Sequence, residues 1–406
     1  MTAVETAASL FATLDAAGAA ADPVASFDRS ALEAIVEAGV YGVSVPAQVG
    51  GLDLPLVEVV DVWAELARAD GSIGWCAFAS DVALAYFGAY LPDEGIDRVF
   101  QGGLPVMAGQ FAPNGTAERD GDDWVVDGDY QFGSGITLAD LAGCGFLATP
   151  AGGGDPSFRF GCFPVSEIEP RGNWDVLGLR GTMSIDYRVH GVRVPDVCSF
   201  DFFAPVVHRG SAMHHLGVLP LTAAGHAAWA LGVTRRALDE LAASTGRVRM
   251  GAPAPLAESE HVLISYARLE SRWAAGRAWV HEVCAAVEAE AAERGGPPEA
   301  LSADRLRQAC VHVNSEGADI ARVAAQTGDA QTSRLAAMSR AARSVPVWIR
   351  NIRDQIGVDP SFFGRRGQEL AAASAAGDMA LMSYIQRLPN EDTETAAALE
   401  SLAPSA

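Results

Sequence analysis

The sequence contains no lysine, so all 29 of its basic residues are arginines. Arginine without lysine is typical of a genomic composition bias. The arginines are outnumbered by 51 acidic residues, which gives a formal net charge of −22 at pH 7. A chain with this charge repels polyanions, which argues against nucleic acid and against anionic membranes as partners. We attribute the acidic surface to solubility before any more specific role.

The sequence also lacks a CxxC pair, a predicted membrane span and a predicted secretory signal. The six cysteines form no CxxC pair and follow no regular spacing, which indicates reduced, mostly buried thiols. No stretch of about 20 uncharged apolar residues predicts a membrane span. The first residues include Glu5 and Asp15 and have no basic segment before an apolar run, so they do not predict a secretory signal. We therefore expect a cytoplasmic protein.

The hydrophobic period changes along the 406 residues, which predicts more than one packed subdomain. Residues 1–104 have helical periodicity. Residues 105–205 show apolar side chains at alternate positions, which indicates strands with one buried face. Residues 206–390 predict long helices joined by short loops, as in a four-helix-type bundle. Residues 391–406 form an acidic tail.

Two helices in the first section are strongly indicated. One is amphipathic and covers 56–69, and the next is more apolar and extends from an N-cap at Ser72 to about Tyr90. The second helix carries aromatic residues that could line a substrate cavity. At helical spacing such a set is more often core; its members are Trp75, Phe78, Tyr86 and Phe87.

The last section predicts five helices. The first three cover 219–246, 256–293 and 302–327, and weaker patterns suggest helices at 333–344 and 366–386.

One stretch of the β section combines several unusual residues. A strand is predicted to end at Trp174 and Asp175, a turn with glycines at both ends to follow at 178–182, and a second strand at 187–194. The glycines allow the backbone to approach a ligand closely. Arg180 would then offer its planar fork of donors, and Thr182 and Ser184 would each offer a hydroxyl. An ordinary turn with a surface arginine is the alternative.

The stretch from Trp174 to Asp186 resembles the Trp-x-x-x-Gly-Leu-Arg-Gly-Thr-x-Ser-x-Asp signature of the acyl-CoA dehydrogenase superfamily. It is most similar to the branch of flavin-dependent two-component monooxygenases. The resemblance covers most of the chain. It implies an α+β, acyl-CoA dehydrogenase-like fold, with an N-terminal helical domain, a middle β-barrel or sandwich domain and a C-terminal four-helix bundle. It also implies a homotetramer.

Two further segments resemble flavin contacts of the family: Gly109 to Pro113, and the aromatic-x-Ser-Gly step at Phe132 to Gly135. An aromatic side chain can cover a flavin face, and a serine can bond the polar edge of the ring. Taken alone, Ser134 would be better explained as a turn residue between strands. The cofactor-binding residues implied by the resemblance are Gln110, Phe111, Ala112, Phe132, Gly133, Ser134, Arg180 and Thr182.

In the family, arginines of a neighbouring subunit meet the cofactor phosphates. Arg247 and Arg249 lie where such an arginine would fall, and either could pair with a diphosphate through two hydrogen bonds. The alternative is that they are cations placed favourably at the end of a helix.

The resemblance fails near the C-terminus. The segment from Arg350 to Asp354 resembles the family's Arg-x-x-Arg-Asp, but the glutamate or histidine that often follows it is missing. Ser361 is the nearest replacement, and Asp359 suits a turn better than a base. His226 is a further candidate, although a buried core histidine is the commoner explanation. The pair His214 and His215 lacks a convincing third ligand, so no metal is expected.

Together with these residues, the resemblance implies the oxygenase component of a two-component monooxygenase. It would take reduced FAD or FMN from a separate flavin reductase and use O2 to hydroxylate a small organic substrate. The signature and the missing glutamate favour this function over an FAD-dependent acyl-CoA dehydrogenase or a non-catalytic subunit of the same fold. The predicted catalytic residues are Ser134, His226 and Ser361.

Overall fold

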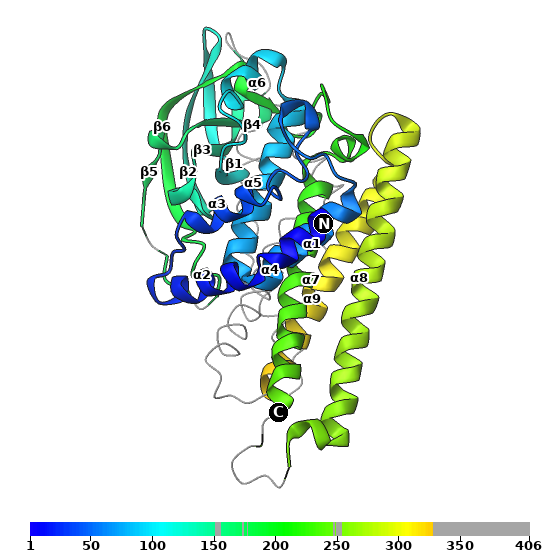
Figure 1. The fold of residues 1–406 in the computed structure, drawn as a ribbon. Helices are drawn as coiled ribbons and strands as arrows, with labels where there is room; N and C mark the ends of the chain where they lie inside the picture. The colour runs from blue at the N-terminus through cyan, green and yellow to red at the C-terminus, as the bar shows by residue number, and fades with distance from the viewer. Residues whose placement is uncertain (151–155, 173, 177, 247, 249–253, 328–406) are drawn as a thin grey trace, which may run out of the picture.

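The structure is a computed structural model, and it describes residues 1–150, 156–172, 174–176, 178–246, 248 and 254–327. Helices near the N-terminus lie between a β-sheet and a group of long helices (Figure 1). None of the described helices combines the length and hydropathy that a membrane span requires. All six cysteines are buried and free, as the sequence predicts.

The N-terminal part contains six helices among the described residues. The predicted helix over 56–69 is confirmed at both ends. The helix after it is confirmed too, but Ser72 is not its N-cap. The Asp70 carboxylate accepts hydrogen bonds from the backbone N–H groups of Ser72 and Ile73, both at 2.9 Å, because a carboxylate suits the positive end of a helix. The helices are α1 (Ala3–Ser9), α2 (Phe11–Val24), α3 (Ser30–Glu37), α4 (Leu56–Ala69), α5 (Gly71–Tyr90) and α6 (Asp93–Val99).

In the middle part, the described residues form one seven-stranded sheet in the order β5-β6-β2-β1-β3-β4-β7. β1 and β3 run parallel, and the other paired strands run antiparallel. The sheet is curled: a Cβ atom on Gly161 of β4 would lie 2.9 Å from Val194 of β6, although three strands separate them. The predicted β domain is thus confirmed. Its strands are β1 (Met107–Asp120), β2 (Asp123–Gly133), β3 (Leu141–Thr149), β4 (Ser157–Pro164), β5 (Glu169–Pro170), β6 (Ile185–Pro195) and β7 (Ser199–Asp201).

The prediction of a strand that ends at Trp174 and Asp175 is wrong, while the second predicted strand is confirmed as β6. The indole N–H of Trp174 donates to the carbonyl oxygens of Leu179 at 3.3 Å and Arg180 at 3.1 Å. The ring therefore closes a loop on itself, and β5 has already ended at Pro170.

β1 contains a bulge that matters for the site. Its pairing with β3 shifts between Gln110 and Gly115, so that residues 111–114 of β1 oppose Gly145 alone. Gly145 permits this because a Cβ atom there would lie 1.9 Å from the carbonyl oxygen of Phe111. Bulges of this kind redirect side chains and are frequent beside active sites.

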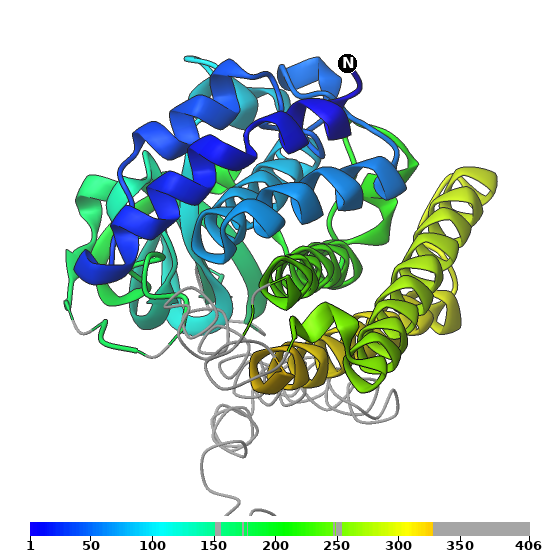
Figure 2. The same cartoon turned by 60° about the horizontal axis from the view of Figure 1, so that its bottom comes forward.

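The long helices are α7 (Val218–Thr245), α8 (Glu260–Arg294) and α9 (Ala300–Thr327). In Figure 2, α7 lies between the N-terminal helices and the pair α8 and α9. α7 approaches α4 so closely that a Cβ atom on Gly232 would lie 2.1 Å from the carbonyl oxygen of Ala64. The first three predicted helices of this section are confirmed. Those at 333–344 and 366–386, and the tail 391–406, lie outside the described residues, and the proposed domain limits stay predictions.

Candidate active site

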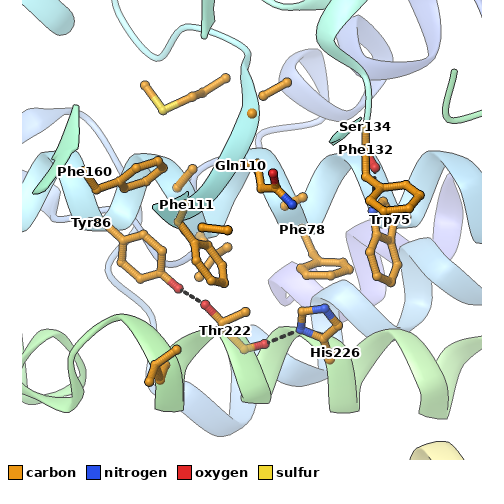
Figure 3. A pocket seen from close by; sticks show the side chains of 18 residues that line it. Trp75, Phe78, Tyr86, Gln110, Phe111, Phe132, Ser134, Phe160, Thr222 and His226 are labelled. Atoms are coloured by element: carbon orange, nitrogen blue, oxygen red, sulfur yellow. Dashed lines mark hydrogen bonds between the residues drawn. The ribbon is translucent and has the colours of Figure 1, made fainter. Parts of the chain in front are cut away.

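A cavity of about 150 Å³ lies where α5, the sheet and α7 meet (Figure 3). Most of its lining is aromatic or aliphatic. None of the lining residues among the described part of the chain is an aspartate, glutamate or arginine. The side chains that bring polar atoms to the lining are Tyr86, Gln110, Ser134, Thr222 and His226, with the indole of Trp75.

The aromatic face of α5 forms one wall. Trp75, Phe78 and Tyr86 line the cavity, whereas Phe87 packs against Phe160 and Phe200 at centroid distances of 5.1 and 5.3 Å. All four α5 side chains are also buried. Three of the four side chains are therefore both core residues and cavity-lining residues, because each is buried and has one side towards the cavity.

The β1 bulge places Gln110, Phe111 and Ala112 in the lining. The backbone N–H of Gln110 donates to the hydroxyl of Tyr187 at 3.0 Å, and that hydroxyl donates to the carbonyl oxygen of Gly143 at 3.1 Å. A side chain from β6 thus fixes the point at which β1 leaves the sheet.

The end of β2 brings Phe132 and Ser134 to the same cavity, with the buried Gly133 behind them. Phe132 has a φ of 59° and is 39% exposed. The nearby loop contains two further non-glycine residues with positive φ, Leu179 at 54° and Met183 at 45°. Such backbone strain costs roughly 1–3 kcal/mol per residue and concentrates at functional sites, so it supports a ligand site here.

A row of hydroxyl groups continues from Ser134 into the protein. Ser134 Oγ lies 2.7 Å from Ser184 Oγ, which lies 2.6 Å from Thr182 Oγ1. The Thr182 hydroxyl donates to the carbonyl oxygen of Leu179 at 2.8 Å. The indole N–H of Trp75 donates to Ser134 Oγ at 3.2 Å. The structure thus joins Ser184, the second hydroxyl of the signature stretch, to Ser134. Its spacing of two from Thr182 puts both hydroxyls on one side of an extended chain.

Arg180 lies outside the cavity lining. Its guanidinium donates to the carbonyl oxygen of Asp22 at 3.1 Å and to the carboxylate of Asp175 at 2.9 Å. It therefore ties the signature loop to the end of α2. Thr182 is buried behind Ser184 and is likewise absent from the lining. Cofactor contacts by these two residues stay predictions.

His226 reaches the cavity from α7. Its Nδ1 lies 2.8 Å from the carbonyl oxygen of Thr222, which can only accept, so Nδ1 carries the hydrogen. The ring stands edge-on to Trp75 and Phe78, with centroids 5.2 and 5.4 Å away. Burial lowers the pKa of His226 to about 4. The imidazole is therefore neutral near pH 7, and Nε2 is its acceptor atom.

The remaining predicted residues fall elsewhere. Ser361, Arg247 and Arg249 lie outside the described residues, so their roles stay predictions. His214 is buried, and its Nε2 donates to the carbonyl oxygen of Ser44 at 3.0 Å, a bond that holds the fold together. Within the described part of the chain, no group of three or more His, Cys, Asp or Glu side chains could hold a metal ion.

Comparison with known proteins places this site in a family. The model of the acyl-CoA dehydrogenase N-terminal domain matches residues 4–91, and that of the acyl-CoA dehydrogenase C-terminal domain matches residues 224–350. The indole-3-acetate monooxygenase of Acinetobacter baumannii is 28% identical over 308 residues, which are 74% of this chain and 77% of that protein. The oxygenase component of p-hydroxyphenylacetate 3-hydroxylase from the same species is 25% identical over 60% of this chain and 62% of that protein.

A solved structure has the same fold. The 3-HSA hydroxylase from Rhodococcus sp. RHA1 superposes with a TM-score of 0.77 at 18% identity, covering 88% of this chain and 98% of that one. The chain belongs to the acyl-CoA dehydrogenase superfamily. Within it, this protein is a flavin-dependent monooxygenase, the oxygenase component of a two-component system.

The cavity residues fit a flavin. A flavin ring system presents two flat faces and one polar edge. The half-exposed ring of Phe132 offers a surface for a face, while Gln110 and Ser134 offer an amide and a hydroxyl for the edge.

Proposed function

We propose that this oxygenase hydroxylates a neutral aromatic compound bound between α5, the β1 bulge and α7. The observation that carries the proposal is the lining itself, which is aromatic and carries no charged side chain among the described residues. A buried carboxylate without a cation is costly, so the lining favours an uncharged substrate. The two relatives named above act on indole-3-acetate and p-hydroxyphenylacetate, which supports an aromatic ring.

Reduced FAD or FMN, supplied by a separate reductase, would bring O2 activation to this site. We assign Phe132 to the ring face and Gln110 and Ser134 to its polar edge. The packed aromatic side chains of α5 exclude water, which would otherwise divert the activated oxygen to peroxide. A homotetramer and a cytoplasmic location stay predictions.

We assign His226 to the substrate side of the cavity. With its Nδ1–H held by Thr222, the neutral ring offers Nε2 as an acceptor for a hydroxyl or ring N–H of the substrate. Trp75 and Phe78 fix its orientation. Because the pKa of His226 is about 4, this acceptor is present throughout the neutral range.

Indole and indole-3-acetate form a matched pair that tests the proposal. We expect kcat/KM for indole to be at least roughly tenfold higher than for indole-3-acetate, a difference of about 1.4 kcal/mol. The reason is that indole-3-acetate must bury its carboxylate. The measurement is product formation with a flavin reductase present, with peroxide followed in parallel. A preference for indole-3-acetate would contradict the neutral-substrate proposal and indicate a cation at the site.

The burial of His226 also predicts a pH effect on stability. Its folded pKa lies below the usual 6.5, so the unfolded chain binds more protons between the two values, and stability falls as pH is lowered through this window. His226→Gln removes this contribution. Between about pH 6.5 and pH 4.5 the variant should therefore lose roughly 2 kcal/mol less unfolding free energy than the unaltered protein.

Urea unfolding at both pH values measures this difference. His208→Gln is the control for the loss of a histidine, since the His208 side chain is exposed. Equal losses in the His226 variant and the unaltered protein would show that His226 titrates normally.

A further inference from the structure

The hydroxyl row behind the cavity has only one consistent arrangement of hydrogens. It ends at the carbonyl oxygen of Leu179, which can only accept, so the single hydroxyl hydrogen of Thr182 points there. Thr182 Oγ1 must then accept from Ser184, at 2.6 Å. This uses the only hydroxyl hydrogen of Ser184, so Ser134 must donate to Ser184, at 2.7 Å.

Ser134 therefore has no hydrogen left for a ligand. Its oxygen has two lone pairs, and the indole N–H of Trp75 donates to one of them at 3.2 Å. The other remains available on the side of the cavity that Ser134 lines. Thr182 and Ser184 are 1% and 4% exposed, so bulk water does not compete for their hydrogens. Ser134 thus faces the cavity as an acceptor.

We propose that Ser184 and Thr182 are positioning residues that make the site selective for reduced flavin, by fixing Ser134 as a hydrogen-bond acceptor. Reduced flavin carries a hydrogen on N5, which could be donated to the Ser134 oxygen. In oxidised flavin the same N5 has a lone pair and no hydrogen. This lone pair would face the lone pair of the Ser134 oxygen, and no hydrogen bond would form. The inference rests on the proposed function, which puts the polar edge of the flavin at Ser134, and it takes N5 as the atom of that edge that would meet the serine.

This selectivity suits a protein that receives its cofactor from another one. The reduced form is retained while substrate reacts, and the oxidised form is released for the reductase to use again. The serine that touches the ring does not achieve this alone, because a free hydroxyl can rotate and serve either form.

The test is an anaerobic titration of the purified full chain with the same flavin in its oxidised and reduced forms. Calorimetry measures the affinity of the protein for each form. We expect the unaltered protein to bind the reduced form at least roughly tenfold more tightly, as one hydrogen bond gained against one unsatisfied acceptor implies. In Ser184→Ala the Ser134 hydroxyl can turn towards the cavity. The oxidised form should then bind more tightly, and the ratio should approach one.

Thr182→Val frees the hydrogen of Ser184 and should shift the ratio in the same direction, which keeps the test available if one variant fails to fold. Ser244→Ala is the matched control, because Ser244 is equally buried and its hydroxyl donates to the carbonyl oxygen of Leu241 in its own helix. It should leave the ratio unchanged.

A ratio that Ser184→Ala and Thr182→Val leave unaltered would overturn the inference while leaving the proposed function intact. Equal weakening of both flavin forms would overturn it too, since that result shows a purely structural role. If the unaltered protein binds neither form, the proposed function itself fails, and the inference fails with it.

Discussion

Ala83→Phe should almost abolish hydroxylation while the oxidation of flavin continues. Ala83 lies on the cavity face of α5, two helical turns after Trp75, and lines the cavity. A phenyl ring there would occupy much of a volume of about 150 Å³. Substrate kcat/KM should fall roughly 100-fold, about 2.7 kcal/mol, because the substrate can no longer enter.

Product and peroxide are measured together in the presence of a reductase. Peroxide should account for nearly all of the oxygen consumed by the variant. Ala242→Phe is the matched control, since Ala242 is an exposed residue of α7. Unchanged product formation by Ala83→Phe would mean that the substrate binds elsewhere.

Ser134→Ala should uncouple the reaction. Removing the hydroxyl leaves the polar edge of the flavin without the acceptor assigned to it, so activated oxygen should be lost as peroxide before it reaches the substrate. The rate of peroxide release should rise roughly tenfold, the effect of one hydrogen bond of about 1.4 kcal/mol.

The ratio of product to peroxide at saturating substrate measures coupling directly. Ser244→Ala again serves as the control for the loss of a buried hydroxyl. Unchanged coupling in Ser134→Ala would remove this residue from the flavin site.

Local periodicity was enough to predict most of the elements. α4 shows this best, because its apolar side chains recur every three or four residues and Asp70 follows its last residue. The capping error at α5 has a local cause. Asp70 and Ser72 are both good N-cap residues two positions apart, and spacing alone does not decide between them.

The site was predicted only in part, because its members meet across long separations. The resemblance pointed to Phe132 and Ser134, but no local pattern indicated that Trp75 would donate to Ser134 or that His226 of α7 would stand against Trp75. Arg180 is a similar case. The signature singles out Arg180, yet the carbonyl oxygen to which its guanidinium donates belongs to Asp22, 158 residues earlier. Such pairings depend on tertiary packing, which a sequence period does not encode.

We infer that this chain binds reduced flavin and controls its reaction with oxygen. The most direct measurement mixes the protein and anaerobically reduced flavin with oxygenated buffer, and follows the absorbance of oxidised flavin with time. With the protein present, oxidised flavin should appear much later than in a solution of free flavin. A time course identical to that of free flavin would contradict it.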